Sequence, residues 1–134
     1  MANPRTSQGH TLVAVLIAAT AVVHVALAAV PSARPGWVAA VSGLLTLVAA
    51  ALLVAGLAAP RTRFGGDAED AWLVACAATG AVGVALGLVV AYLSFSGGRN
   101  DVDLLSIGAL LMDALTVRIA VFTLRRVPAP PARR

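Results

Sequence analysis

Residues Ala71–Phe95 read AWLVACAATGAVGVALGLVVAYLSF and contain no charged side chain. A helix needs about 20 apolar residues to cross the hydrocarbon core of a bilayer, so this stretch is long enough to span a membrane. Three further stretches of similar length and apolar character occur at Thr11–Val30, Trp37–Ala59 and Val102–Leu124. The sequence therefore predicts an all-α membrane protein, a bundle of four transmembrane helices.

The composition favours a membrane protein with little room for a soluble domain. Of the 134 residues, 60% are hydrophobic and 12% are charged, and the mean hydropathy is +0.91. Soluble domains carry about 25% charged residues. We expect a single transmembrane domain over residues 11–124, between a cytoplasmic N-terminal tail, residues 1–10, and a basic cytoplasmic tail, residues 125–134. Any chemistry would then occur in the bilayer, at its surface or on a partner.

The distribution of arginine predicts how the chain is oriented. Segments beside a span that are rich in Lys and Arg stay on the cytoplasmic side. With four spans, both termini and the Pro60–Asp70 connection share one side. That side holds seven arginines, Arg5, Arg61, Arg63, Arg125, Arg126, Arg133 and Arg134, whereas the other side holds only Arg34 and Arg99. We therefore expect both termini to lie in the cytoplasm.

Two further expectations concern the origin and processing of the chain. All ten basic residues are Arg, a bias that is typical of high-GC bacterial genomes, so we expect a bacterial cytoplasmic membrane. Alternatively, residues 1–30 are a cleaved signal peptide, with Arg5 as its charged region and Ala26–Ala28 as a small-residue cleavage site. The apolar run is longer than the 7–15 residues usual in a signal peptide, and this favours a retained first span.

Small residues follow one face of the third span. Gly83 and Gly87 form a GxxxG motif, which lets another helix backbone approach closely. The face as a whole comprises Cys76, Thr79, Gly80, Gly83 and Gly87. It indicates either packing within the four-helix bundle or contact with a second copy or a partner subunit. We expect tight packing and no spacious pore within one protomer. Trp37 lies at the start of the second span, on the outer side, and Trp72 lies at the start of the third span, on the inner side. Indoles commonly anchor both membrane interfaces.

Three polar residues lie within the spans, where lipid should exclude them. Asp113 is near the middle of the fourth span, and a carboxylate at the centre of a bilayer costs about 2.5–3.5 kcal/mol on insertion scales. At about 1.5 Å of rise per residue, His24 lies within one or two helical turns of the same depth. A His24–Asp113 contact is therefore allowed, and such a pair could carry a proton.

Arg118 is not a natural partner of Asp113. Five residues rotate a helix by about 500°, so the two side chains point to faces roughly 140° apart. Arg118 is also close enough to the cytoplasmic end for its long side chain to reach the headgroups. Packing roles remain open for all three residues: Asp113 and His24 as hydrogen-bonded buried groups, and Arg118 as an interfacial cation.

Other chemistries have little support in the sequence. No cluster of His, Cys, Asp and Glu has metal-ligand spacing, no nucleophile has a recognisable context, and we expect no cofactor. The single cysteine, Cys76, excludes an intramolecular disulfide. Nucleic acid is not an expected partner, because the arginines lie at span ends where they orient the chain.

Three functional hypotheses remain. The first, and the one we favour at this point, is a non-enzymatic accessory protein or subunit that packs on a larger membrane complex through the glycine face of the third span. The second is a small oligomeric proton-coupled transporter or channel that uses Asp113 with His24, with a holin-like lysis protein as a variant. The third is a membrane-embedded enzyme acting on a lipid or isoprenoid. The expected partners are the bilayer itself and a larger protein or further copies of the chain.

Overall fold

The computed structural model describes residues 4–30, 35–58, 66–97 and 104–125, all of them in or beside four α-helices. These are α1 (Pro4–Ala29), α2 (Gly36–Ala58), α3 (Gly66–Ser96) and α4 (Leu104–Leu124). Each helix is long and apolar enough to cross a membrane. The prediction of an all-α chain with four candidate spans is confirmed, and the fold is compatible with a multi-pass membrane protein.

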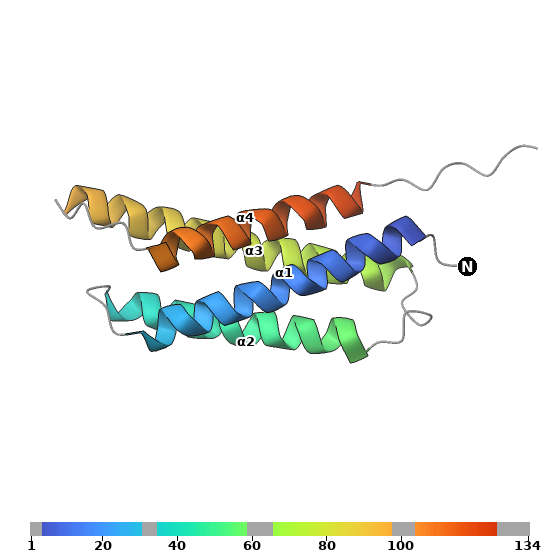
Figure 1. Ribbon diagram of the computed structural model, residues 1–134, viewed down its shortest axis with the longest axis horizontal. Helices are drawn as coiled ribbons and strands as arrows, with labels where there is room; N and C mark the ends of the chain where they lie inside the picture. Colours follow the sequence, from blue (N-terminus) through green and yellow to red (C-terminus); the bar gives the residue numbers. More distant parts are fainter. Residues whose placement is uncertain (1–3, 31–34, 59–65, 98–103, 126–134) are drawn as a thin grey trace, which may run out of the picture.

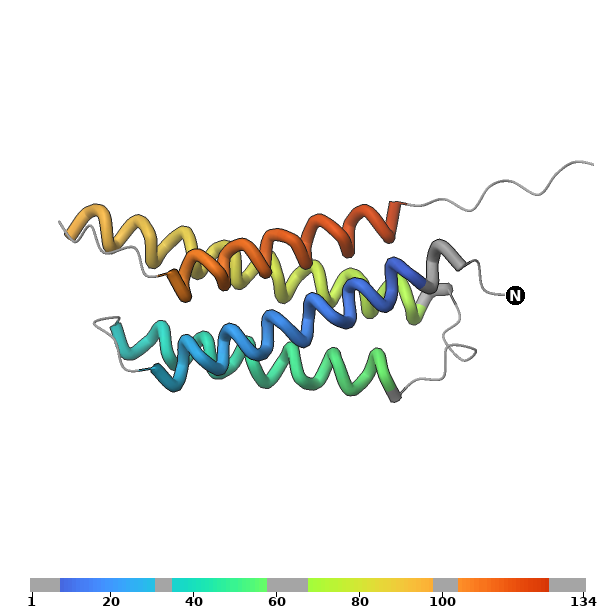
Figure 2. Tube along the Cα trace, viewed as in Figure 1, coloured from blue at the N-terminus to red at the C-terminus, as the bar shows by residue number. Residues whose placement is uncertain are grey.

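The helices run alternately up and down in one bundle (Figure 1). The starts of α1 and α3 and the ends of α2 and α4 lie together at what we call the terminal end. The opposite end, where α1 and α3 finish and α2 and α4 begin, is the distal end (Figure 2). The closest packing is between α1 and α2 and between α3 and α4, with α1 also running along α4.

Two helices begin earlier than their apolar runs. Because α1 starts at Pro4, the part of the predicted N-terminal tail from Pro4 to His10 is helical. Proline is well tolerated in a first helical turn, where its missing N–H is not needed. Helix α3 starts at Gly66, so Glu69 and Asp70 lie near its N-terminus, where acidic side chains complement the helix dipole. The predicted tail residues 126–134 lie outside the described residues.

An apolar core fills the half of the bundle nearer the terminal end. Ile17 and Val13 of α1, Ala49 of α2 and Ala120 of α4 are fully buried there. The complete cluster consists of Val13, Ala14, Ile17, Ala49, Trp72, Leu73, Cys76 and Ala120. Most of the large hydrophobic residues that remain face outward, as expected where lipid replaces water as the surrounding medium. The first span is thus an integral part of the packing.

Trp72 does not lie at the surface as an interfacial anchor, so that expectation was wrong. Its ring is 5% exposed, stacks on His10 with centroids 4.4 Å apart, and donates a hydrogen bond of 2.8 Å to the carbonyl of Leu52. Gly56 makes room for the ring, because a Cβ there would approach its Cζ2 atom to 2.7 Å. The indole N–H needs a partner when buried, and the α2 backbone supplies one. Trp37, by contrast, is 43% exposed at the distal end.

This arrangement predicts different effects for two glycines of α2. Gly56→Ala should destabilise the protein by about 1–3 kcal/mol, because the added methyl group overlaps an indole that is fixed by its hydrogen bond and by His10. Gly43→Ala should be neutral or slightly stabilising, since a Cβ at Gly43 meets nothing within 4 Å and alanine is the better helix former. Reversible unfolding in mixed detergent micelles would measure both; equal effects would contradict the packing described for Trp72.

Candidate functional site

A histidine and an aspartate from opposite ends of the sequence meet in the middle of the bundle. His24 Nε2 of α1 lies 3.0 Å from Asp113 Oδ2 of α4. His24 is 1% exposed and Asp113 is fully buried. We call these two residues the central pair. The structure thus brings together the two residues that the sequence could place only at a similar depth.

Local sequence explains why both side chains point inward. On α1 the residues Ile17, Thr20, His24 and Leu27 follow one another at intervals of three or four and are all buried, so they form one helix face. On α4 the buried residues Ala109, Asp113, Thr116 and Ala120 follow the same spacing. The hydroxyls of Thr20 and Thr116 approach within 3.4 Å, directly beside the central pair on its terminal side. The contact between these two helix faces therefore contains two adjacent polar pairs, His24 with Asp113 and Thr20 with Thr116.

Gly83 of α3 closes the site from a third side. A Cβ at this position would overlap the carboxyl group of Asp113, so only glycine leaves room for the carboxyl in this geometry. One turn earlier, a Cβ at Gly80 would lie 2.9 Å from the backbone oxygen of Asp113. One turn later, a Cβ at Gly87 would lie 3.0 Å from Leu110. The glycine face of α3 is therefore covered by α4 of the same chain.

The remaining small residues of that face have local roles. Thr79 is buried and donates its hydroxyl to the carbonyl of Ala75, one turn back on its own helix, at 2.8 Å. Cys76 is fully buried in the apolar core, where it packs as a small hydrophobic side chain. Neither residue contributes a group to the central pair.

Arg118 lies away from the central pair. It is exposed, whereas Asp113 on the same helix is fully buried. It belongs to the outward stripe of α4, together with Ile107, Leu111, Leu115 and Phe122. The rotation of about 140° between positions 113 and 118 accounts for the separation. Of the three polar residues singled out in the spans, two form the site and the third faces outward.

Three buried polar atoms in this part of the bundle have no hydrogen-bond partner among the described residues. They are His24 Nδ1, Asp113 Oδ1 and Ser42 Oγ. Ser42 is fully buried on α2, six residues from the start of that helix, while His24 lies five residues from the end of α1. At about 1.5 Å per residue the two are at similar depths from the distal end. Unpaired buried polar atoms are costly, so their concentration here distinguishes this layer from the apolar core.

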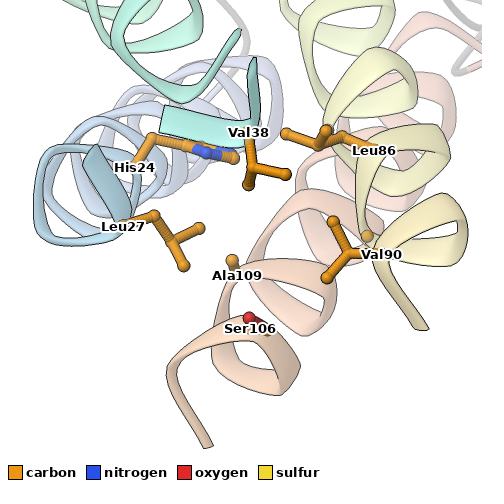
Figure 3. Close-up of a pocket in the computed structure, with 9 residues that line it drawn as sticks. His24, Leu27, Val38, Leu86, Val90, Ser106 and Ala109 are labelled. Carbon is orange, nitrogen blue, oxygen red and sulfur yellow. The ribbon is translucent and has the colours of Figure 1, made fainter. Parts of the chain in front are cut away.

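A small cavity adjoins the central pair on its distal side. It offers about 20 Å³ to the centre of a water molecule, and roughly 10–15 Å³ is enough to hold one. All four helices contribute to its wall (Figure 3). His24 lies at its inner end, and Ser106 and Val90 lie toward the distal end, where both are only half-buried. The lining residues are His24, Leu27, Val38, Gly83, Leu86, Gly87, Val90, Ser106 and Ala109.

A second histidine lies at the terminal end, outside the central pair. His10 Nδ1 is 3.5 Å from Glu69 Oε1, and its ring stacks on Trp72. This contact joins α1 to the start of α3. The sequence does not predict this contact, because His10 and Glu69 both lie outside the apolar runs and are far apart in the chain. Within the described parts of the chain, no three His, Cys, Asp or Glu residues lie close enough to hold a metal ion.

The fit of Asp113 against α3 predicts that Gly83 is sensitive to any added atom. Gly83→Ala should lower the free energy of unfolding by about 1–3 kcal/mol, because either the carboxyl or the α3 backbone must move. Gly108→Ala on α4 is the matched control, since a Cβ there meets nothing within 4 Å. Unfolding in mixed micelles would compare the two. A harmless Gly83→Ala would mean that α3 does not pack on Asp113.

The central pair also predicts energetic coupling between α1 and α4. His24→Leu and Asp113→Ala should each leave a buried polar partner without its hydrogen bond. The double variant should therefore lose less stability than the sum of the two, by about 0.5–3 kcal/mol. Combining Asp113→Ala with His10→Leu, at the other end of the bundle, should give additive losses. Additivity in both combinations would show that His24 and Asp113 do not interact.

Comparison with known proteins supplies no family for the chain: no family model, no curated protein and no solved structure matches it.

Proposed function

We propose that this protein binds and transfers a proton at the central pair, as a small proton-coupled transporter or channel. The observation that carries the proposal is the buried contact between His24 and Asp113, at 3.0 Å. Ionisable residues inside membrane spans are costly, so they are rare and commonly belong to ion or proton pathways. Histidine is suited to proton transfer, because its ring can carry a proton on either nitrogen and a neighbouring carboxylate can balance the added charge.

The net charge of the central pair changes when it takes up a proton. A neutral imidazole beside a carboxylate has a net charge of −1. Uptake of one proton makes the site neutral, either as an imidazolium facing a carboxylate or as an imidazole facing a carboxylic acid. An unpaired charge in an apolar interior is strongly unfavourable. Release of the proton then requires water or a counter-charge to approach the pair.

We further propose that both termini face the cytoplasm of a bacterium and that the protein resides in its cytoplasmic membrane. Seven of the nine arginines outside the spans lie on the side of the two termini, as the positive-inside rule requires. The described fold supports this placement only in part, by bringing the starts of α1 and α3 and the ends of α2 and α4 to one end of the bundle. In this orientation the cavity beside His24 faces the exterior.

A second candidate function is that of an accessory subunit in a larger membrane complex. The outward stripe of α4 favours it, because Arg118 is exposed there among apolar side chains, where an acidic group of a partner could pair with it. The glycine face of α3 is not available for such a contact, since α4 covers it. A subunit contact would therefore use the stripe that contains Arg118.

Reconstitution into proteoliposomes tests the proposed function directly. Wild-type protein should carry protons down an imposed pH gradient, as reported by a pH-sensitive dye inside the vesicles. Asp113→Asn should abolish this flux, because the amide cannot take up the proton and the site loses its negative charge. Asp70→Asn is the matched control: it makes the same chemical change at an exposed position of α3, and flux should persist.

Each result has a definite meaning, provided that the variants elute as folded, monodisperse protein. Loss of flux in Asp113→Asn but not in Asp70→Asn would support proton transfer at the central pair. Unchanged proton flux in Asp113→Asn would contradict the proposal. No flux from the wild type, together with a stoichiometric larger protein that co-purifies in mild detergent and is lost on Arg118→Ala, would favour the accessory role.

A further inference from the structure

We infer that the cavity beside His24 is a water-binding site that delivers protons to the central pair from the distal side only. This inference rests on the proposed function and adds the route and the ligand. Three features carry it: the cavity, the Nδ1 atom of His24, which has no partner among the described residues, and the apolar core between the central pair and the terminal end.

The first feature is a space of the right size at the right place. The cavity can hold about one water molecule, and its wall includes the fully buried ring of His24. Apolar cavities stay dry, but a polar group at the wall can retain a water. Here the polar groups are the imidazole at the inner end and Ser106 toward the distal end, and Leu27 and Val38 are among the apolar side chains that also line the cavity (Figure 3).

The second feature is that the two ring nitrogens of His24 have different surroundings. Nε2 is engaged by Asp113, whereas Nδ1 is buried and has no partner in the described part of the chain. His24 lines the cavity, and in the inferred route a water held there hydrogen-bonds to Nδ1 after a small shift of the ring. A hydronium ion there would give its proton to Nδ1 and remain as water, while the Asp113 carboxylate at Nε2 balances the charge gained by the imidazole. Nδ1 is thus the entry atom and Asp113 the fixed counter-charge.

The third feature is the apolar core that separates the central pair from the terminal end in the described part of the chain. Between the central pair and the terminal end lie the Thr20–Thr116 contact and then the apolar core, in which Ile17 and Ala120 are fully buried. In the described residues this core joins all four helices. In the route we infer, a proton on His24 leaves through the cavity toward the distal end, whereas the apolar core would have to rearrange before the proton could reach the terminal end.

Cysteine labelling tests this one-sided access. In a Cys76→Ala background, which removes the chain's only cysteine, two further variants place a thiol on α4: Ala109→Cys in the cavity wall and Ala120→Cys in the apolar core. Both alanines are buried, at 5% and 0% exposure, so the substitutions are matched. The probe is Ag⁺, a bare thiol-reactive cation small enough for a space that holds one water molecule. It is added to proteoliposomes on one side, with free cysteine on the other side to remove any Ag⁺ that crosses.

The expected result is that Ala109→Cys gains the mass of one adduct when the reagent is on the distal side and none when it is on the terminal side. Ala120→Cys should gain none from either side. The inference is overturned if Ala109→Cys stays unmodified from the distal side, if it reacts from the terminal side, or if Ala120→Cys reacts equally. Labelling does not depend on flux: labelled Ala109→Cys without proton transport would refute the proposed function and leave the water-filled cavity standing.

Discussion

The need to bury a carboxylate without leaving it unpaired governs the arrangement of the bundle. Asp113 lies in a helix whose other buried residues are small or weakly polar, so its carboxyl must find a partner inside the protein. His24 of α1 supplies that partner at 3.0 Å. Gly83 of α3 supplies the space. Three of the four helices are therefore fixed relative to one another by one side chain, in a medium that gives little hydrophobic driving force between helices.

The two halves of the bundle differ in character as a consequence. Toward the terminal end the interior is apolar and closely packed, and Trp72 of α3 donates a hydrogen bond to the carbonyl of Leu52 in α2. Toward the distal end the interior contains the central pair, the cavity and the Ser42 hydroxyl, which has no hydrogen-bond partner among the described residues. Rigid packing on one side and polar, partly open packing on the other is an arrangement suited to a site that exchanges with one aqueous phase.

The sequence predicted the fold class well because the length and hydropathy of a span are local properties. It also placed His24 and Asp113 at similar depths, since the rise per residue is constant along a helix. It could not show that the two side chains face each other, because the rotation of each helix depends on packing against its neighbours. For the same reason it left the glycine face of α3 open between a partner and α4.

Trp72 shows where a local pattern is misleading. A tryptophan near the end of an apolar run is typical of an interfacial anchor. Here the absence of a side chain at Gly56 and the helical extension of α1 as far back as Pro4 create an internal place for the ring, beside His10. Neither condition can be read from the residues around Trp72. The residues that bury the ring belong to α1 and α2, and their positions beside Trp72 follow only from the packing of the whole bundle.

The central claim is that His24 and Asp113 are in contact inside the bundle, and solid-state nuclear magnetic resonance in lipid bilayers measures it most directly. The chain has two histidines, so His10→Gln leaves His24 as the sole source of a ring-nitrogen signal. With ¹⁵N in the histidine ring and ¹³C in the aspartate carboxyls, we predict a strong dipolar coupling between the two labels that disappears in Asp113→Ala. A protein that is folded in bilayers and shows no such coupling would contradict the account.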